Sequence, residues 1–235
     1  MSQIRPFRGI RPVAKHVEKV ASPPYDVLNS EEARQLVQDN PLSFLRVVKA
    51  EVDFPAKTDL YGQQIYDRSK SNLENLIANG QMEQDELPGF YLYELEMNGH
   101  VQIGLVAGTS VQEYEDGLIK KHEFTRREKE DDRARHVMTL MANTGPVFLT
   151  YRSLDLIDEL VARLRKADPD YNFVADDGIR HTLWAICDEA QVAELAAAFD
   201  KLDCLYIADG HHRSASAFRA RNALREENPA HDGSE

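Results

Sequence analysis

The sequence predicts an α+β fold, or a mixed-sheet α/β fold, from three observations. Segments with helical periodicity alternate with short apolar segments of strand length along the chain. Asn98-Gly99 separates two strand-like segments and predicts a β-hairpin, so the sheet is not purely parallel. The apolar segment 204–208 leads directly into Asp209-Gly210-His211-His212-Arg213, called the DGHHR motif below. We expect an N-terminal α+β region (1–115) and a phosphate-site region (116–235), or one continuous domain.

The N-terminal region begins with a stretch in which prolines restrict the backbone. Ser22-Pro23-Pro24-Tyr25-Asp26 is expected to be a rigid extended segment that ends in a turn. Ser30 is the expected N-cap of the helix that follows, because two glutamates favour its first turn. The elements expected in this region are helix 30–39, strand 43–48, helix 60–78 ending at Asn79-Gly80, and strands 89–97 and 101–109.

In the second region a densely charged segment, residues 120–135, is expected to form a helix with Glu123 and Arg127 one turn apart. The other expected elements are strand 146–151, helix 154–166, strand 182–188, helix 189–202, strand 204–208, helix 214–227 and a turn at Asp232-Gly233. Because the chain stops about one helix after the DGHHR motif, we expect it to be part of a longer protein.

Charge and apolar content limit the classes of function. Forty acidic residues oppose 28 basic ones, for a net charge of -12 without a sustained basic run, which argues against a nucleic-acid partner. The apolar runs are too short to span a bilayer and no signal peptide is visible, which predicts no membrane partner and a cytoplasmic location. Cys187 and Cys204 lack metal-like spacing and are expected to be buried thiols. The oligomeric state is left open.

The DGHHR motif predicts a phosphate site. A buried strand that turns directly into a helix presents the free amides and the positive dipole end of the first helical turn to an anion. Gly210 allows a close backbone approach, and Arg213 offers a planar fork for phosphate oxygens. The other donors in this turn are His211, His212 and Ser214.

Asp209 has a different expected role, because a carboxylate repels a bare phosphate and instead suits Mg²⁺. Two alternatives compete with the phosphate site. In one, Asp209 only caps the helix and the histidines pack on the surface. The other is a zinc site, which is disfavoured because adjacent histidines do not easily ligate one ion.

A strand followed by the DGHHR motif resembles the free L-serine kinases, a family that shares its fold with ParB-type proteins and sulfiredoxin. The resemblance implies a ParB/sulfiredoxin-like core around the strand, motif and helix, with the motif over nucleotide phosphates. In that family the base on the serine hydroxyl is the glutamate of a short His-Glu segment. Lys120-Lys121-His122-Glu123 is similar to that segment, which implies that Glu123 is the base. Secondary candidates for the site are His122, Thr125, Arg126, Tyr25 and Asp26.

The whole chain also resembles a broad bacterial family known only as a domain of unknown function. The segments that carry this resemblance are residues 22–27, Asn40-Pro41, Lys121-His122-Glu123 with Thr125, Asp132-Arg133 and residues 208–213.

The expected function is Mg²⁺-dependent phosphoryl transfer to the hydroxyl of a small metabolite, first of all free L-serine. The expected catalytic residues are Glu123, Asp209 and His211. The donor is expected to be ATP, ADP or pyrophosphate, and because no Walker A sequence is present the sequence does not choose among them. The alternative is a ParB-like nucleotide-binding module or switch without metabolite kinase activity. Sulfiredoxin-type redox chemistry is disfavoured because His211 stands where a cysteine is needed.

Overall fold

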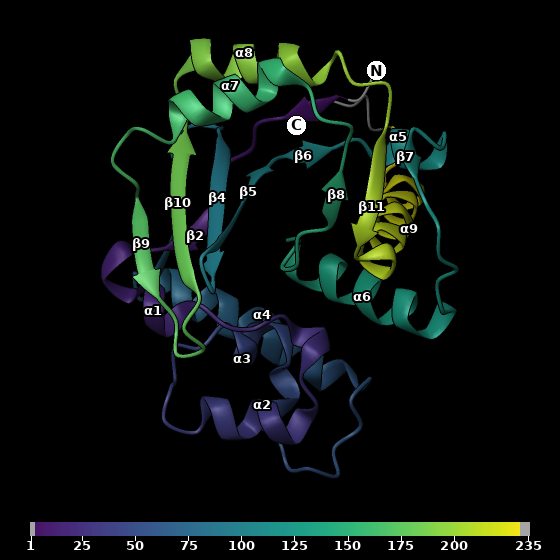
Figure 1. The fold of residues 1–235 in the computed structure, drawn as a ribbon. Coiled ribbons are helices and arrows are strands. Elements are labelled where there is room, and N and C mark those ends of the chain that lie inside the picture. The colour runs from purple at the N-terminus through teal and green to yellow at the C-terminus, as the bar shows by residue number, and fades with distance from the viewer. Residues whose placement is uncertain (1–2, 231–235) are drawn as a thin grey trace.

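A four-stranded antiparallel sheet forms one side of the molecule in this computed structural model, which describes residues 3–230 (Figure 1). Its strand order is β5 (His100–Val106), β4 (Phe90–Met97), β10 (Arg180–Ile186) and β9 (Tyr171–Val174). The predicted hairpin is confirmed, because β4 pairs with β5 around Asn98 and Gly99. Both turn residues have positive φ, at 51° and 77°, as a two-residue turn matched to the strand twist requires.

A second sheet carries the DGHHR motif. Its order is β7 (Ile119–Lys120), β11 (Leu205–Asp209) and β8 (Phe148–Thr150), with β11 parallel to β7 and antiparallel to β8. Two further antiparallel pairs of short strands are present. β1 (Ile4–Arg5) pairs with β6 (Gly108–Thr109), and β2 (Ile10–Pro12) pairs with β3 (Met82–Gln84). The mixture of hairpins and one parallel pair confirms the predicted α+β class.

Helices α7 (Asp155–Leu164) and α8 (Glu189–Phe199) lie across the ends of both sheets, at the top of Figure 1. α7 is amphipathic, and its apolar face at Ile157, Leu160 and Leu164 is buried. These side chains share one core with Phe90 of β4 and Ile207 of β11, so the two sheets are joined through the helices. Burial of each such side chain stabilises the fold by about 1.5–3 kcal/mol.

The N-terminal helices form a separate layer, at the bottom of Figure 1. They are η1 (Ala14–His16), α1 (Val17–Val20), η2 (Tyr25–Val27), α2 (Ser30–Val37), α3 (Leu45–Val48), η3 (Ala50–Asp53) and α4 (Gln63–Ala78). A second core joins Val20 of α1, Val47 of α3 and Leu73 of α4 to Leu140 at the end of α6 (Arg127–Leu140). α6 therefore packs against this layer, with α4 as its neighbour.

The C-terminal helix α9 (His211–Glu227) packs along α6 and against the short α5 (Val111–Glu115). Small buried residues of α9, Ala215, Ser216 and Ala220, allow the close approach. The hydroxyl of Ser216 donates to the carbonyl of Glu130 on α6 at 3.2 Å. This packing places the start of α9 beside the start of α6.

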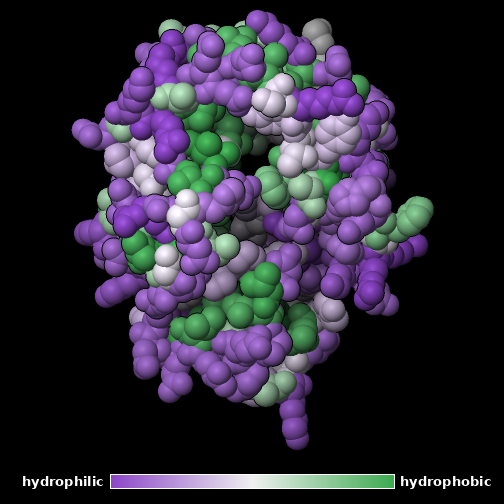
Figure 2. Space-filling model, viewed as in Figure 1, coloured by the Kyte–Doolittle hydropathy of each residue, from purple (hydrophilic) through white to green (hydrophobic). Residues whose placement is uncertain are grey.

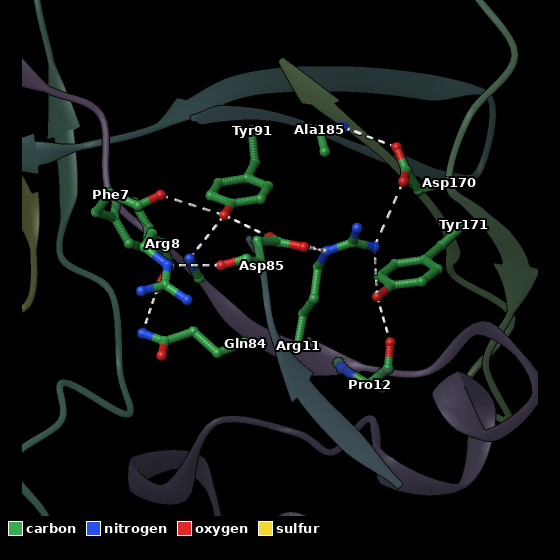
Figure 3. Close-up of polar contacts among 11 residues, drawn as sticks. Phe7, Arg8, Arg11, Pro12, Gln84, Asp85, Tyr91, Asp170, Tyr171 and Ala185 are labelled. Carbon is green, nitrogen blue, oxygen red and sulfur yellow. Dashed lines mark hydrogen bonds and ion pairs between the residues drawn. The ribbon is translucent and has the colours of Figure 1, made fainter. Parts of the chain in front are cut away.

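A polar network holds the N-terminal segment against the first sheet (Figure 3). The Asp85 carboxylate accepts hydrogen bonds from Arg11 Nε at 2.8 Å and from the Tyr91 hydroxyl at 2.7 Å. The same hydroxyl accepts from the Gly9 amide at 2.8 Å. Arg11 Nη1 also donates to the Tyr171 hydroxyl at 2.9 Å, so the network connects β2 to β4 and β9.

Three element predictions in the N-terminal layer and around α6 were wrong. Residues 45–48, expected in a strand, form helix α3, because a short buried apolar run has the same pattern in either structure. The N-cap of α2 is Asn29, not Ser30, and it forms a capping box with Glu32. α6 begins at Arg127, since residues 119–120 pair with β11 as a strand and Arg126 is extended, so Glu123 is outside the helix.

Three further differences concern the C-terminal region. α9 begins at His211, three residues earlier than expected, and β9 was not predicted. Cys187 and Cys204 are partly exposed rather than buried. The expected turn at Asp232-Gly233 lies outside the described residues.

The face shown in Figure 2 is mostly hydrophilic, with hydrophobic residues gathered in an upper hollow and in a patch across its lower part. Within residues 3–230, no helix is long and apolar enough to cross a membrane.

Candidate functional site

The DGHHR motif occupies a strand-to-helix junction. β11 is buried at Leu205 and Ile207, and the chain then turns at Gly210, which has φ 92° and ψ 31° and is the N-cap of α9. A Cβ atom at this position would lie 3.1 Å from Arg213 Nε, so glycine suits both the backbone and the neighbouring guanidinium. The first turn of α9 has no acidic residue and no side-chain cap. Its amides and the positive dipole end can therefore receive an anion.

Arg213 is held by three oxygen atoms. Its guanidinium forms an ion pair with Asp209, donates to the carbonyl of Pro146, and lies 3.5 Å from Asp26 Oδ2. Asp26 belongs to η2, so the structure brings this candidate residue to the motif across 187 positions. Both carboxylates are exposed while Arg213 is mostly buried. They offer the oxygen ligands that Mg²⁺ prefers, next to the predicted phosphate site.

The two histidines of the motif hold the predicted His-Glu segment. His211 is buried, and its Nδ1 lies 3.6 Å from Glu123 Oε2. The His122 amide donates to His211 Nε2 at 3.5 Å, and the two imidazole rings meet edge to face with centroids 4.4 Å apart. The Arg126 amide donates to His212 Nε2 at 3.1 Å. Residues 121–126 are thereby held beside the motif.

The buried position of His211 also affects its proton affinity. Burial lowers the pKa of His211 from its ordinary value, and the neighbouring His122 lowers it further. The nearby carboxylates of Glu123 and Asp209 act in the opposite direction. The net effect favours a neutral imidazole, which can accept as well as donate.

Two other candidate residues have local structural partners. The Thr125 hydroxyl donates to Glu130 at the start of α6. The Ser214 amide donates to the Gly210 carbonyl at 2.9 Å and closes the first turn of α9, so its amide is not free for a ligand. Ser214 does not line the cavity described below, so the structure does not bring this predicted residue into the site.

A cavity of about 370 Å³ lies between the N-terminal helices and the motif. One wall comes from the N-terminal layer and includes Tyr25, Asp26, Ser30, Lys49, Glu51, Tyr61 and Tyr66. The other wall includes Glu123, Lys129, Asp132, Arg133, His136 and residues 208–213. Both predicted halves of the site, Glu123 and the DGHHR motif, therefore face one polar cavity.

Several residues of the cavity were not predicted as site residues. Arg133 Cζ lies 4.6 Å from the centroid of the Tyr25 ring and its guanidinium pairs with Asp132 at 2.8 Å. The Tyr66 hydroxyl donates to Asp132 Oδ1 at 2.7 Å, and burial and this carboxylate raise the pKa of Tyr66. In the sequence, Asp132-Arg133 could also be an ordinary pair on a helix.

Lys49 and Glu51 form a second group that the sequence did not reveal. Their ion pair spans 3.1 Å, and Glu51 Oε1 also accepts from the Ser30 hydroxyl at 2.9 Å. Glu51 is only 8% exposed, and a buried carboxylate requires such partners. Lys49 and Glu51, separated by Ala50 and following the apolar Val47-Val48, were the available signal for a polar wall.

Searches among curated proteins and among solved structures found no match to this chain. The family model DUF1015, described as a protein of unknown function, matches residues 4–235. This match agrees with the whole-chain resemblance seen in the sequence. The chain therefore belongs to the DUF1015 family.

Proposed function

We propose that this protein transfers a phosphoryl group to the hydroxyl of a small metabolite, with Mg²⁺ and with ATP, ADP or pyrophosphate as donor. Free L-serine is the first candidate acceptor because the motif resembles that of the free serine kinases. The observation that carries the proposal is the contact between Glu123 Oε2 and His211 Nδ1, at 3.6 Å, on the wall of a polar cavity.

Each step of the transfer has a residue suited to it. The acceptor hydroxyl oxygen attacks the transferred phosphorus, the bond to the leaving phosphate or nucleotide oxygen breaks, and Glu123 takes the hydroxyl proton. Glu123 is 62% exposed at its side chain and so is accessible to an acceptor. Arg213 neutralises charge on the phosphoryl oxygens, and His211, His212 and the first-turn amides of α9 donate hydrogen bonds to them.

Asp209, with Asp26 beside it, is the proposed Mg²⁺ ligand. The ion would supply charge neutralisation at the donor phosphates. Both carboxylates pair with Arg213 in the structure described, so binding of the donor would redistribute these ion pairs. The cavity of about 370 Å³ is within the size range of small-molecule sites, about 300–1,000 Å³.

The test is an assay for O-phosphoserine by ³¹P NMR, with L-serine, Mg²⁺ and each of the three donors in turn. We expect product from one donor with the wild-type chain and at least a 100-fold lower rate with Glu123→Gln, because removal of a general base costs about 10²–10⁴-fold. Glu128→Gln is the matched control, since Glu128 is an exposed glutamate that does not line the cavity.

Three results would count against the proposal. They are absence of product from all donors, unchanged activity of Glu123→Gln, and equal loss in both variants. Tight nucleotide binding without product would instead favour the ParB-like binding module. Calorimetry with each donor distinguishes these cases because it detects binding without turnover.

A further inference from the structure

Three potential metal ligands from two distant segments meet beside the cavity. His122 and Glu123 lie between β7 and α6, and His211 is the first residue of α9. One ligand atom of each side chain lies within 4.8 Å of the other two. In the sequence, zinc is disfavoured because His211 and His212 are adjacent. In the structure, however, His211 lies beside His122.

We propose that His122, Glu123 and His211 form a binding site for a transition-metal ion of the Zn²⁺ class. Two imidazole nitrogens and one glutamate oxygen are the protein ligands of several zinc sites that keep a fourth position open. Imidazole ligands select Zn²⁺, Co²⁺ or Ni²⁺ over Mg²⁺, which requires oxygen ligands. This site is therefore distinct from the Mg²⁺ position proposed at Asp209.

The three ligand atoms need to move only a short distance toward one another to bind one ion. Zinc binds these ligands at about 2.0–2.2 Å, so two ligand atoms of one ion are separated by at most about 4 Å. Glu123 Oε2 and His211 Nδ1 already meet this limit at 3.6 Å. His122 and Glu123 are exposed and can rotate, while the buried His211 supplies a fixed point.

Metal binding at His211 fixes which ring nitrogen carries the imidazole proton. A metal bound at His211 Nδ1 requires the imidazole proton on Nε2, where the His122 amide now donates over a long 3.5 Å contact. That contact would be lost, and the remaining proton would face the main chain. The site therefore suits an ion that binds reversibly rather than a permanent structural zinc.

The proposal has a consequence for Glu123. A carboxylate that ligates Zn²⁺ cannot also accept a proton from an acceptor hydroxyl. If the proposed phosphoryl transfer holds, micromolar Zn²⁺ should inhibit it, and added Mg²⁺ should not restore the rate. The metal site itself does not depend on the proposed function, because ion binding is measurable without any donor or acceptor.

The experiment is calorimetric titration of the full chain with Zn²⁺, repeated with Co²⁺ to record its visible absorption. We expect one ion per chain in the wild type, and at least tenfold weaker binding in His122→Ala and in Glu123→Gln. His100→Ala is the matched control, because His100 is an exposed histidine on β5 outside the cluster. It should bind Zn²⁺ like the wild type.

Circular dichroism of each variant checks that the fold is retained, which is expected because both substituted side chains are exposed. The proposal is overturned if the wild type binds no Zn²⁺, or if His122→Ala and Glu123→Gln bind it as tightly as the control. Absence of phosphoserine together with Zn²⁺ binding that depends on these residues would refute the transfer reaction and leave the metal site standing.

Discussion

His136 is a buried imidazole on the wall of the cavity, and its environment differs from that of His211. It is 3% exposed, and its Nε2 lies 3.0 Å from the Ser69 hydroxyl and 3.1 Å from the Val47 carbonyl. Burial lowers the pKa of His136 to about 4, and Arg133 contributes in the same direction. The imidazole is therefore neutral in the folded chain and joins α6 to α3 and α4.

This pKa predicts a loss of stability in mild acid. Between pH 6.5 and 4 the unfolded chain binds a proton at His136 that the folded chain does not bind, so the free energy of unfolding falls as the pH falls. The decrease is on the order of 1.4 kcal/mol for each pH unit across this interval. Urea unfolding at pH 7.5 and pH 4.5 measures the decrease.

His136→Gln should reduce this pH dependence, because glutamine does not titrate. His100→Gln, which removes an exposed histidine, should leave it unchanged. An equal pH dependence in wild type and His136→Gln would contradict the assignment to His136.

At the scale of elements, the helices α2 and α9 begin in opposite ways. α2 is capped by the Asn29 side chain, which accepts from the Glu31 and Glu32 amides. α9 begins at Gly210 without a side-chain cap, and this leaves its first-turn amides free of side-chain partners. A capped helix start is stabilised locally, whereas an uncapped start retains donors for a ligand.

Substitution of Gly210 tests how the junction holds Arg213. Gly210→Ala and Gly178→Ala both introduce a Cβ at positive φ, 92° and 80°, and each should cost about 1–2 kcal/mol of stability. A Cβ at position 178 meets nothing within 4 Å, whereas one at 210 lies 3.1 Å from Arg213 Nε. Gly210→Ala should therefore cost roughly 1 kcal/mol more, through the displaced charge-assisted hydrogen bonds.

Urea unfolding of both variants gives the two losses directly. An equal decrease in the free energy of unfolding for the two variants would mean that Arg213 moves aside without losing stabilising hydrogen bonds. Comparison of the two variants separates the cost of backbone strain from the cost of the contact with Arg213, because Gly178→Ala introduces backbone strain without such a contact.

At the scale of the whole molecule, long-range polar contacts join segments that the chain order separates. The network around Asp85 joins residues 9–11 to β4 and β9 (Figure 3), while the cavity brings the N-terminal helices to α6 and α9. Burial raises the pKa of Tyr91, and its hydrogen bond to Asp85 adds to this effect. The Tyr91 hydroxyl thus stays protonated and serves as both donor and acceptor.

Tyr91→Phe should destabilise the chain by about 1–3 kcal/mol, because the Gly9 amide and the Asp85 carboxylate each lose a partner in a partly buried place. Tyr61→Phe is the matched control, since Tyr61 is 57% exposed. Its effect should be within about 0.5 kcal/mol. Thermal unfolding of the two variants checks the difference, and a loss in Tyr91→Phe as small as in the control would show that the network is dispensable.

The sequence by itself determined the elements with strong local signals. These are α4, the β4–β5 hairpin, α7, α8 and the passage from β11 into α9. Each signal depends on periodicity, turn residues or caps within a few positions, and such short-range preferences act before tertiary contacts form. The same local signals placed the DGHHR motif at a helix start, whereas the His-Glu segment came only from the resemblance to the free serine kinases.

Only the tertiary structure decided the features that depend on distant partners. Residues 45–48 became a helix because Val47 packs with α4 in the second core. Residues 121–126 left the predicted helix because β7 pairs with β11 and the two motif histidines bind the following main chain. The contact of His122 with His211 joins residues 89 positions apart, and no local pattern encodes such a contact. The fold, not the sequence pattern, therefore determines which charged residues share the cavity, because burial and pairing depend on the packing of separate elements.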